Sequence, residues 1–422
     1  MATGYYDERL DPILQDLGSH SSHLTHLTFG YVREATVRMA DILSSCPHLQ
    51  SFEVESAHFD LTHLPQGTFP SLKTLRIGAA YQHIPHDDMV TLLKLLPSLE
   101  YFGINPWQTT KTLTAIQEYC RSLKFLQCGP QPMNKDWKQL PMDSQHGLQC
   151  IQIQGLRNEI HDPCDIDLLL ECHHNTLQVI ELSFLCSQSI DLNLLFPRLR
   201  RLVIKSGSMD ESCFYGWWIL KNAPNIKELE FDTIVSENCH GLIQGLQHFT
   251  SLGSLKLYAD TGYLLPTSHS LLHDFLKHQT QLQSLEAHVK SYMLADRSWS
   301  TSICSMSRLQ YLDLYIVDDT YPSSATFVKY LLRHCPLLET LHLRCRRGIT
   351  DHILLFIRWK YLNELTIPIV NLSRTGIMSL INCVCLKNLN IIQSADDDEK
   401  AVKMLMKARP DMQINSSDFY RH

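Results

Sequence analysis

The amino-acid sequence predicts an α/β fold: a right-handed, horseshoe-like solenoid with a parallel sheet on its concave face and mostly helices on its convex face. Three observations predict it. A short phrase of three apolar residues recurs along the chain, apolar patterns of helical period separate its copies, and proline or cysteine marks the turn before many of them. The chain has 422 residues, 44% of them hydrophobic, so it can bury a large core.

The recurring phrase is clearest at Cys335–Leu343, where Leu338, Leu341 and Leu343 are the three apolar positions. The second and third positions differ by two, the period of a strand, so both side chains face one side of a short parallel strand. Fifteen copies begin 22 to 30 residues apart, close to the period of a leucine-rich repeat. The first apolar residues of the copies are Leu24, Leu49, Leu72, Leu99, Leu123, Leu148, Leu177, Leu199, Ile226, Leu252, Leu282, Leu309, Leu338, Leu362 and Leu386.

Between the phrases, apolar residues of period 3.6 predict helices that pack behind the strands. Examples are the pattern Val32, Met39 and Leu43 and the ranges 89–96 and 327–331. One strand and one helix cannot bury their own apolar faces, so neighbouring repeats must stack. The segments 55–70, 129–147 and 184–197 are richer in Pro, Gly, Ser and Asn, and we expect loops there.

The turn into each strand has its own signal. The residue three before the first apolar position is usually apolar, as at Cys46, Cys120, Cys335 and Cys383. Proline cannot continue a helix, so a proline here indicates the end of the helix and the start of the turn. Proline stands two before the first apolar position at Pro47, Pro70, Pro97, Pro197, Pro224 and Pro336.

We interpret the chain as one continuous repeat domain. Residues 1–23, with an amphipathic stretch at Asp7–Leu17, are expected to form an N-terminal cap, and residues 24–410 a solenoid of about 15 repeats. A last helix, with Val402, Leu405 and Met406 facing inward, should end before Pro410 and close the solenoid. Residues 411–422 are predicted to be a polar C-terminal tail.

The phrase that contains Cys335 and Pro336 is followed by Gly348-Ile349-Thr350-Asp351. Together they resemble the cysteine-containing leucine-rich repeat of F-box/leucine-rich-repeat proteins, which are ribonuclease-inhibitor-like substrate receptors of cullin-type ubiquitin ligases. The resemblance covers roughly residues 24–392. It implies substrate recognition in ubiquitin-dependent protein catabolism and, if an F-box lies upstream, contact with the cullin-ligase adaptor.

The resemblance does not extend to an F-box. Only 23 residues precede the first repeat, fewer than that helical module needs, so we expect the repeats without a recognisable F-box. The alternative function is a scaffold or regulator of the same fold without ubiquitin chemistry, similar to the inhibitors and GTPase regulators built on leucine-rich repeats.

Charge and composition exclude several classes of partner. The net charge is −7 and the pI about 6.3, so no basic surface for nucleic acid or anionic membrane is expected. The N-terminus has no apolar core of a signal peptide, and no apolar run reaches the roughly 18 residues of a membrane span. The 14 cysteines are irregularly spaced, which indicates a reducing, intracellular compartment, cytoplasmic or nuclear.

No motif for catalysis or for a cofactor is present: there is no Gly-rich phosphate loop, Gly-x-Ser-x-Gly or His-Glu-x-x-His. We therefore expect a protein that is not an enzyme and holds no cofactor. Cys164, Cys172, His173 and His174 raise a zinc hypothesis, but their spacing fits no standard finger, and packing and solvation explain them better.

Two other clusters have a structural and a functional interpretation. Phe214, Trp217 and Trp218 have ordinary core spacing on a helix, with a partly exposed tryptophan that anchors a partner as the alternative. The basic run Arg344–Arg347 reads as a solvated loop, with a contact to an acidic peptide as the alternative.

The strand period sends the residues between the apolar positions to the concave face, the usual binding surface of such solenoids. In the middle of the chain these residues are both charged and aromatic, a combination suited to an extended peptide or a protein surface. We predict that a protein partner binds them. They are Arg201, Lys205, Glu228, Glu230, Asp232, Lys256, Tyr258, Glu286, His288, Tyr311, Asp313, Tyr315, His342 and Arg344.

Overall fold

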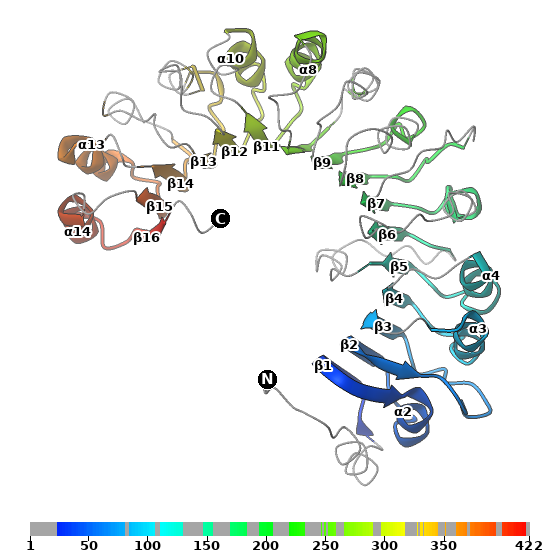
Figure 1. Cartoon of the computed structure of the whole chain (residues 1–422). Helices are drawn as coiled ribbons and strands as arrows, with labels where there is room; N and C mark the ends of the chain where they lie inside the picture. Colours follow the sequence, from blue (N-terminus) through cyan, green and yellow to red (C-terminus); the bar gives the residue numbers. More distant parts are fainter. Residues whose placement is uncertain are drawn as a thin grey trace. The chain divides into compact units, whose positions relative to one another are not determined.

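In each of the fifteen predicted phrases the second and third apolar residues lie on a strand, and in each part of the chain the strands pair in parallel and in sequence order (Figure 1). The chain divides into two compact units, Met1–Leu199 and Arg200–His422. The computed structural model describes residues 23–80, 84–105, 110–129, 147–154, 169–183, 194–205, 219–232, 246, 249, 252–258, 266–289, 297–316, 327, 330–331, 333–344, 351, 360–368, 372–393 and 399–418.

The first unit contains a parallel sheet in the order β1 to β7. The strands are β1 (His26–Arg38), β2 (Ser51–Asp60), β3 (Thr74–Ala80), β4 (Tyr101–Asn105), β5 (Phe125–Cys128), β6 (Cys150–Gln154) and β7 (Val179–Ser183). The helices with described bounds are α2 (Met39–Ser45), α3 (His86–Lys94) and α4 (Thr110–Tyr119).

The second unit contains a parallel sheet in the order β8 to β16. The strands are β8 (Arg201–Lys205), β9 (Glu228–Asp232), β10 (Ser254–Tyr258), β11 (Ser284–Val289), β12 (Tyr311–Ile316), β13 (Thr340–Arg344), β14 (Glu364–Pro368), β15 (Asn388–Gln393) and β16 (Gln413–Asp418). The helical elements with described bounds are α8 (Pro266–His278), α10 (Arg297–Cys304), α13 (Arg374–Ser379), the 3-10 turn η4 (Leu380–Asn382) and α14 (Glu399–Ala408).

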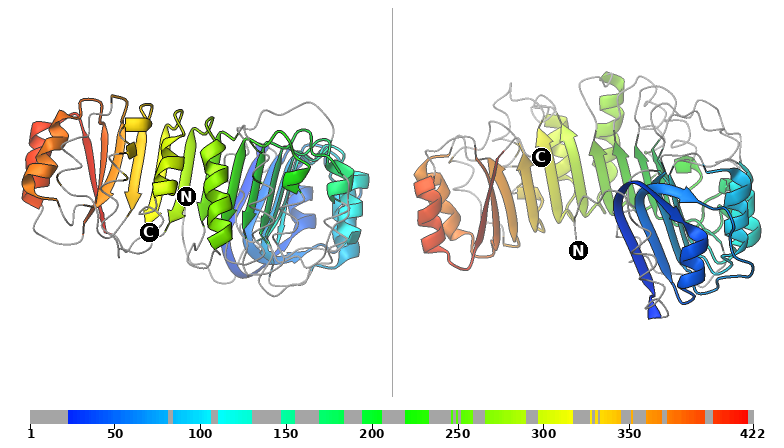
Figure 2. Two further views of the ribbon diagram at one scale, coloured as in Figure 1. Left: turned by 90° about the horizontal axis from the view of Figure 1, so that it is seen from above. Right: turned by 60° about the horizontal axis from the view of Figure 1, so that its bottom comes forward.

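The apolar positions of the phrase form the core. On β13, Leu341 and Leu343 are buried while Thr340, His342 and Arg344 are partly exposed, so the two sets face opposite sides of the sheet. Burying a leucine side chain contributes about 2 kcal/mol, so each repeat gains most of its stability from the repeats beside it. The helices of each unit lie on this buried face of its strands (Figures 1 and 2). The α/β leucine-rich-repeat solenoid is therefore confirmed.

The turn before each strand explains the proline. The backbone N–H of Leu338 donates to the carbonyl of Cys335 at 3.3 Å, closing a four-residue turn with Pro336 at its second position. Proline is favoured at this position because its fixed φ suits the turn. The backbone N–H of Leu49 donates to the carbonyl of Cys46 in the same way.

Side chains at the residue three before the first apolar position link successive repeats. The Cys120 thiol donates to the carbonyl of Leu96, the corresponding residue one repeat earlier, and the Gln279 amide donates to the carbonyl of Phe249. Arg409 fills this position after α14, and its guanidinium donates to the carbonyl of Cys383 at 3.0 Å. A buried carbonyl costs free energy when it has no donor, so these bonds stabilise the stacked turns.

The structure corrects four details of the expected elements. The first is the segment 55–70, expected as a loop, because β2 continues through it as far as Asp60. Val32, expected in a helix, lies in β1, because the stretch from His26 to Arg38 is rich in β-branched and aromatic residues that favour strand. Met406, expected to face inward, is 43% exposed, whereas Leu405 is fully buried. The sheet also continues into the segment predicted as a polar tail, where β16 pairs with β15.

Other expectations lie outside the described residues. These are the N-terminal cap before residue 23, most of the loops 129–147 and 184–197, Cys164, and the cluster Phe214–Trp218. The single continuous domain stays a prediction, because the two units are described separately.

We predict that Leu341→Ala lowers the free energy of unfolding by about 2–5 kcal/mol, because it leaves a cavity in a packed row of leucines. Leu337→Ala changes the same type of residue four positions earlier in the same phrase, where the side chain is 40% exposed, and should change stability by no more than about 0.5 kcal/mol. Urea unfolding followed by circular dichroism measures both. Equal effects of the two substitutions would contradict the assignment of the buried face.

Candidate functional site

The predicted residues lie on the open face of the second unit, defined as the face of its sheet opposite the helices. Strand register aligns them in three rows that cross the strands. The first row contains Arg201, Glu228 and Tyr311; the middle row Glu230, Lys256, Glu286, Asp313 and His342; the third row Lys205, Asp232, Tyr258, His288, Tyr315 and Arg344. For Asp232 only the backbone is described. The backbone register thus puts all fourteen residues at open-face positions, as strand alternation predicted, and their role in binding a partner stays a prediction.

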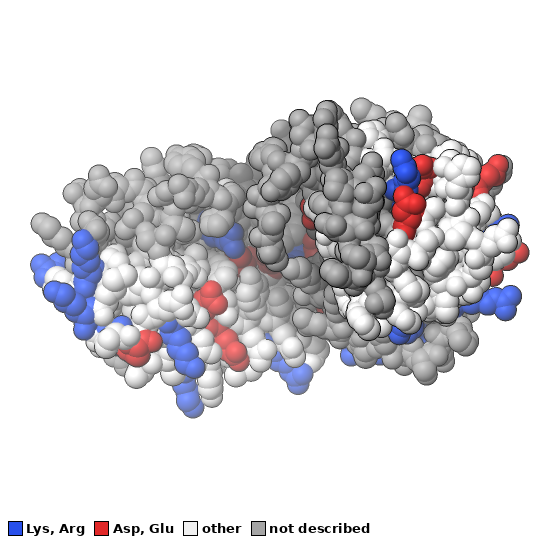
Figure 3. Space-filling model, turned by 90° about the horizontal axis from the view of Figure 1, so that it is seen from below, with Lys and Arg blue, Asp and Glu red and all other residues white. Residues whose placement is uncertain are grey.

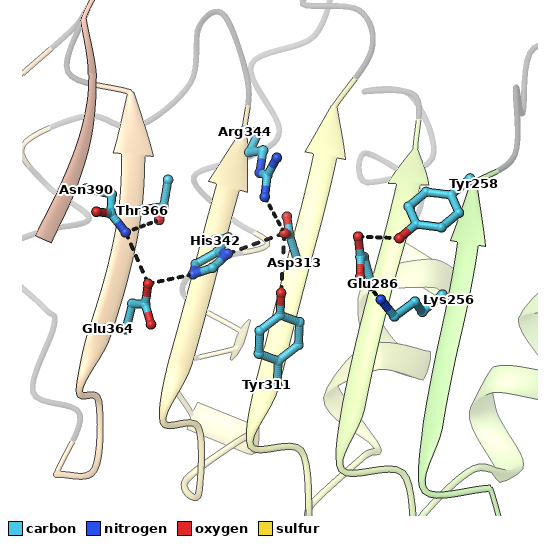
Figure 4. A network of polar contacts seen from close by, with 10 residues as sticks. All are labelled: Lys256, Tyr258, Glu286, Tyr311, Asp313, His342, Arg344, Glu364, Thr366 and Asn390. Carbon is cyan, nitrogen blue, oxygen red and sulfur yellow. Dashed lines mark hydrogen bonds and ion pairs between the residues drawn. The ribbon is translucent and has the colours of Figure 1, made fainter. Parts of the chain in front are cut away.

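Asp313 is the centre of the strongest cluster on this face (Figure 4). Its Oδ2 atom accepts a hydrogen bond from Arg344 Nη2 at 2.8 Å and lies 3.3 Å from His342 Nδ1, both on the neighbouring strand β13. The Tyr311 hydroxyl donates to the same oxygen at 3.5 Å. The carboxylate is buried, so these donors compensate for the water it loses.

His342 extends the cluster to a third strand. Its Nε2 atom lies 3.4 Å from Glu364 Oε1 on β14. The two groups form an ion pair only when the ring carries both protons, and their geometry is not that of a hydrogen bond. Glu364 Oε1 also accepts from Asn390 Nδ2 at 3.1 Å, and that nitrogen lies 3.2 Å from Thr366 Oγ1. The contacts therefore continue from β12 to β15.

The sequence interpretation ended at Arg344 and missed Glu364, Thr366 and Asn390. The same strand alternation could have found all three, because Glu364 and Thr366 flank Leu365 on β14 and Asn390 follows Leu389 on β15. Asn390 also accepts from Asn415 at 2.9 Å, on a strand that the repeat pattern did not predict.

A second cluster centres on Glu286 of β11. Its Oε2 atom lies 3.0 Å from Lys256 Nζ, and its Oε1 atom accepts a hydrogen bond of 2.6 Å from the Tyr258 hydroxyl (Figure 4). Burial and this hydrogen bond raise the pKa of Tyr258 above its ordinary value. The phenol thus stays a neutral donor and its ring has a fixed position on β10.

Three rings lie side by side in the third row. The ring centroids of Tyr258 and His288 are 4.9 Å apart, and those of His288 and Tyr315 are also 4.9 Å apart. Arg344 follows Tyr315 in the row on the next strand, β13. Each of these four side chains is partly exposed. They form a row of aromatic surface that ends at a cation, which we call the aromatic row.

The acidic residues nearest the start of the unit are paired with a single arginine. Arg201 on β8 lies 3.9 Å from Glu228 and 3.7 Å from Glu230, both on β9. Glu228 is exposed and both distances are long, so these pairs contribute little to stability. In Figure 3 charges of both signs lie interspersed among uncharged residues of the described surface. This mixture suits a protein partner better than a polyanion.

The open face of the first unit is different. Tyr101, Phe125, Cys150 and Val179 occupy corresponding open-face positions on β4 to β7 and form a buried apolar cluster. The Tyr101 hydroxyl donates to Gln127, which is also buried. Residues buried in this way are not available to a partner, so the second unit is the better candidate.

The positions of Cys172, His173 and His174 do not support a zinc site. Cys172 is exposed, while His174 contacts the carbonyl of Glu171 and His173 lies 3.4 Å from the backbone N–H of Leu148. Burial lowers the pKa of His173 to about 4. Among the described residues, no group of three or more His, Cys, Asp or Glu side chains could hold a metal ion. No helix in the described part is long and apolar enough to cross a membrane.

Tyr311 gives this site a pH dependence. Burial, together with the negative charge of Asp313, raises the pKa of Tyr311 to about 12, against an ordinary value near 10. Above pH 10 the unfolded chain releases this proton first, so the contribution to stability is complete below about pH 10 and is lost as the pH rises to about 12. We expect the free energy of unfolding to fall more steeply over this range in the wild type than in Tyr311→Phe. Urea unfolding at successive pH values compares them, and parallel profiles would contradict the buried environment.

The sequence matches no protein-family model and no curated protein. The solved structures that match this chain include the following two. One is a TLR13–ssRNA13 complex, with 16% identity over 93% of this chain and a TM-score of 0.47. The other is the mouse RP105/MD-1 complex, with 17% identity over 95% of this chain and a TM-score of 0.46. This chain spans 57% of the length of the TLR13 chain and 68% of the RP105/MD-1 chain. Both TM-scores are below 0.5, so neither likeness carries an argument.

Proposed function

We propose that this chain is a protein-binding leucine-rich-repeat protein whose partner docks on the open face of β10 to β14. The observation that carries the proposal is the partly exposed set Tyr258, His288, Tyr315 and Arg344 beside the paired charges of the middle row. Tyrosine and arginine are the residue types that dominate binding energy at protein interfaces.

Two of the side chains that carry the proposal are hydrogen-bonded to neighbouring strands before any partner binds. Tyr258 is fixed by Glu286, and Arg344 by Asp313. The residues also stand on strands whose other face is the buried core. Side chains that are already ordered lose less conformational entropy on binding, so more of the contact energy becomes affinity. This arrangement favours recognition of a defined partner surface.

The substrate receptor of an F-box-type ubiquitin ligase is a finer version of this proposal, and it rests on the repeat resemblance. Asp351 belongs to the phrase that carries this resemblance. It accepts a hydrogen bond of 2.8 Å from the backbone N–H of Ser373, the residue before α13, and another from the Ser373 hydroxyl. Asp351 thus supports the next repeat's helix, a role that both a ligase receptor and a non-ubiquitin regulator would need.

Peptide-phage selection against the immobilised chain tests the proposal, followed by affinity measurements on the selected ligands. We expect Tyr315→Ala to weaken their binding by about tenfold or more, equivalent to about 1.4 kcal/mol, because a contact ring is lost. The matched control is Tyr361→Ala, which removes a 43% exposed tyrosine from the turn before β14.

Circular dichroism should show that both variants keep the wild-type melting temperature within a few degrees. If every selected ligand binds Tyr315→Ala as well as it binds the wild type, the open face of the second unit is not the binding surface. A separate experiment distinguishes the two finer functions. Adaptor and cullin should co-purify with this protein from cells if it is a ligase receptor, and should not if it is a non-ubiquitin regulator.

A further inference from the structure

We propose that the aromatic row binds a polyproline-II segment with two prolines three residues apart and an acidic residue beyond the second proline. This inference rests on the proposed function and names the chemistry of the partner that would occupy the same face. It is carried by the spacing of the rings and by two nitrogen atoms of Arg344 for which the described part of the chain offers no partner.

The spacing of the row matches this helix. Neighbouring strands lie about 4.7–4.9 Å apart, and the measured ring separations on β10, β11 and β12 are 4.9 Å each. Tyr258 and Tyr315 stand two strands apart, so their backbones are separated by about 9.6 Å. A polyproline-II helix rises about 3.1 Å per residue, or about 9.3 Å over three residues. Prolines at positions i and i+3 would therefore lie on the two tyrosines, with His288 between them.

The pairing of the sheet excludes one common mode of peptide binding, the addition of a strand. An extended peptide that adds a strand needs a free sheet edge. Strands β10, β11 and β12 are each paired on both sides, so a ligand on this face is held by side chains, and one that follows the aromatic row crosses the strands. Polyproline-II segments bind in this way, on aromatic-lined surfaces, and their preformed backbone lowers the entropic cost.

Arg344 is the reason to expect an acidic residue in the ligand. It follows Tyr315 in the row, its side chain is 38% exposed, and its Nη2 atom is bonded to Asp313. Among the described residues, no partner is found for its Nη1 and Nε atoms. Guanidinium nitrogens bind carboxylates strongly, and an acidic residue one or two places after the second proline would reach them. The nearby carboxylates of Glu286 and Asp313 already accept hydrogen bonds or ion pairs from Tyr258, Lys256 and Arg344, so they do not favour a basic residue in the ligand.

The test is fluorescence anisotropy of the full chain with a fluorescein-labelled peptide whose core is Pro-Ser-Ala-Pro-Ala-Glu. Two matched peptides replace both prolines by alanine or the glutamate by lysine. We expect each replacement to weaken binding to the wild type by about tenfold, or 1.4 kcal/mol. Tyr258→Ala and Tyr315→Ala should weaken the parent peptide similarly, and Tyr361→Ala should not.

Arg344→Gln separates the two parts of the proposal. It keeps a side-chain donor for Asp313 but removes the charge, so this variant should bind the glutamate and lysine peptides within about twofold of each other and still prefer prolines. Equal binding of the proline and alanine peptides, or no binding of the parent peptide at about 1 mM, would overturn the inference. Selected ligands without prolines that still require Tyr315 would overturn this inference alone, whereas ligands indifferent to Tyr315 overturn the proposed function as well.

Discussion

The structure depends on one constraint: a single strand with its helix cannot bury its own apolar face. On β13 the side chains of Leu341 and Leu343 are buried because Leu312 and Leu314 of β12 stand in register beside them. A slip of one residue would turn these leucines to the open face and the polar residues into the core. The buried rows therefore favour one register between the neighbouring strands of each unit that carry the repeat phrase.

The same constraint positions the open face. Because the leucines align, the residues between them align too, and Asp313 comes to lie beside His342 and Tyr315 beside Arg344. The distance between neighbouring side chains in a row is then the distance between strands. A binding surface built in this way has a fixed period, which a ligand of matching period can use. The packing of the core and the chemistry of the face are consequences of one repeat.

The period of two predicted the strands and the open-face residues, because alternation depends only on local backbone geometry. It did not predict β16, where Ser416 stands opposite Ile391 in place of the third apolar residue. It also did not predict which open faces are accessible: Tyr101 and Phe125 occupy positions equivalent to Tyr311, yet they are fully or nearly buried. Side-chain pairing across strands, such as Glu364 with His342, depends on three-dimensional distances that the pattern does not contain.

The most direct test of the central claim is site-specific photo-crosslinking from the aromatic row. The photoreactive amino acid p-benzoylphenylalanine would replace Tyr315 on the open face or Tyr361 on the turn before β14, and each protein would be irradiated with a selected ligand. The account predicts a crosslink from position 315 and none from position 361. A crosslink from position 361 alone would contradict it and move the binding surface to the turns.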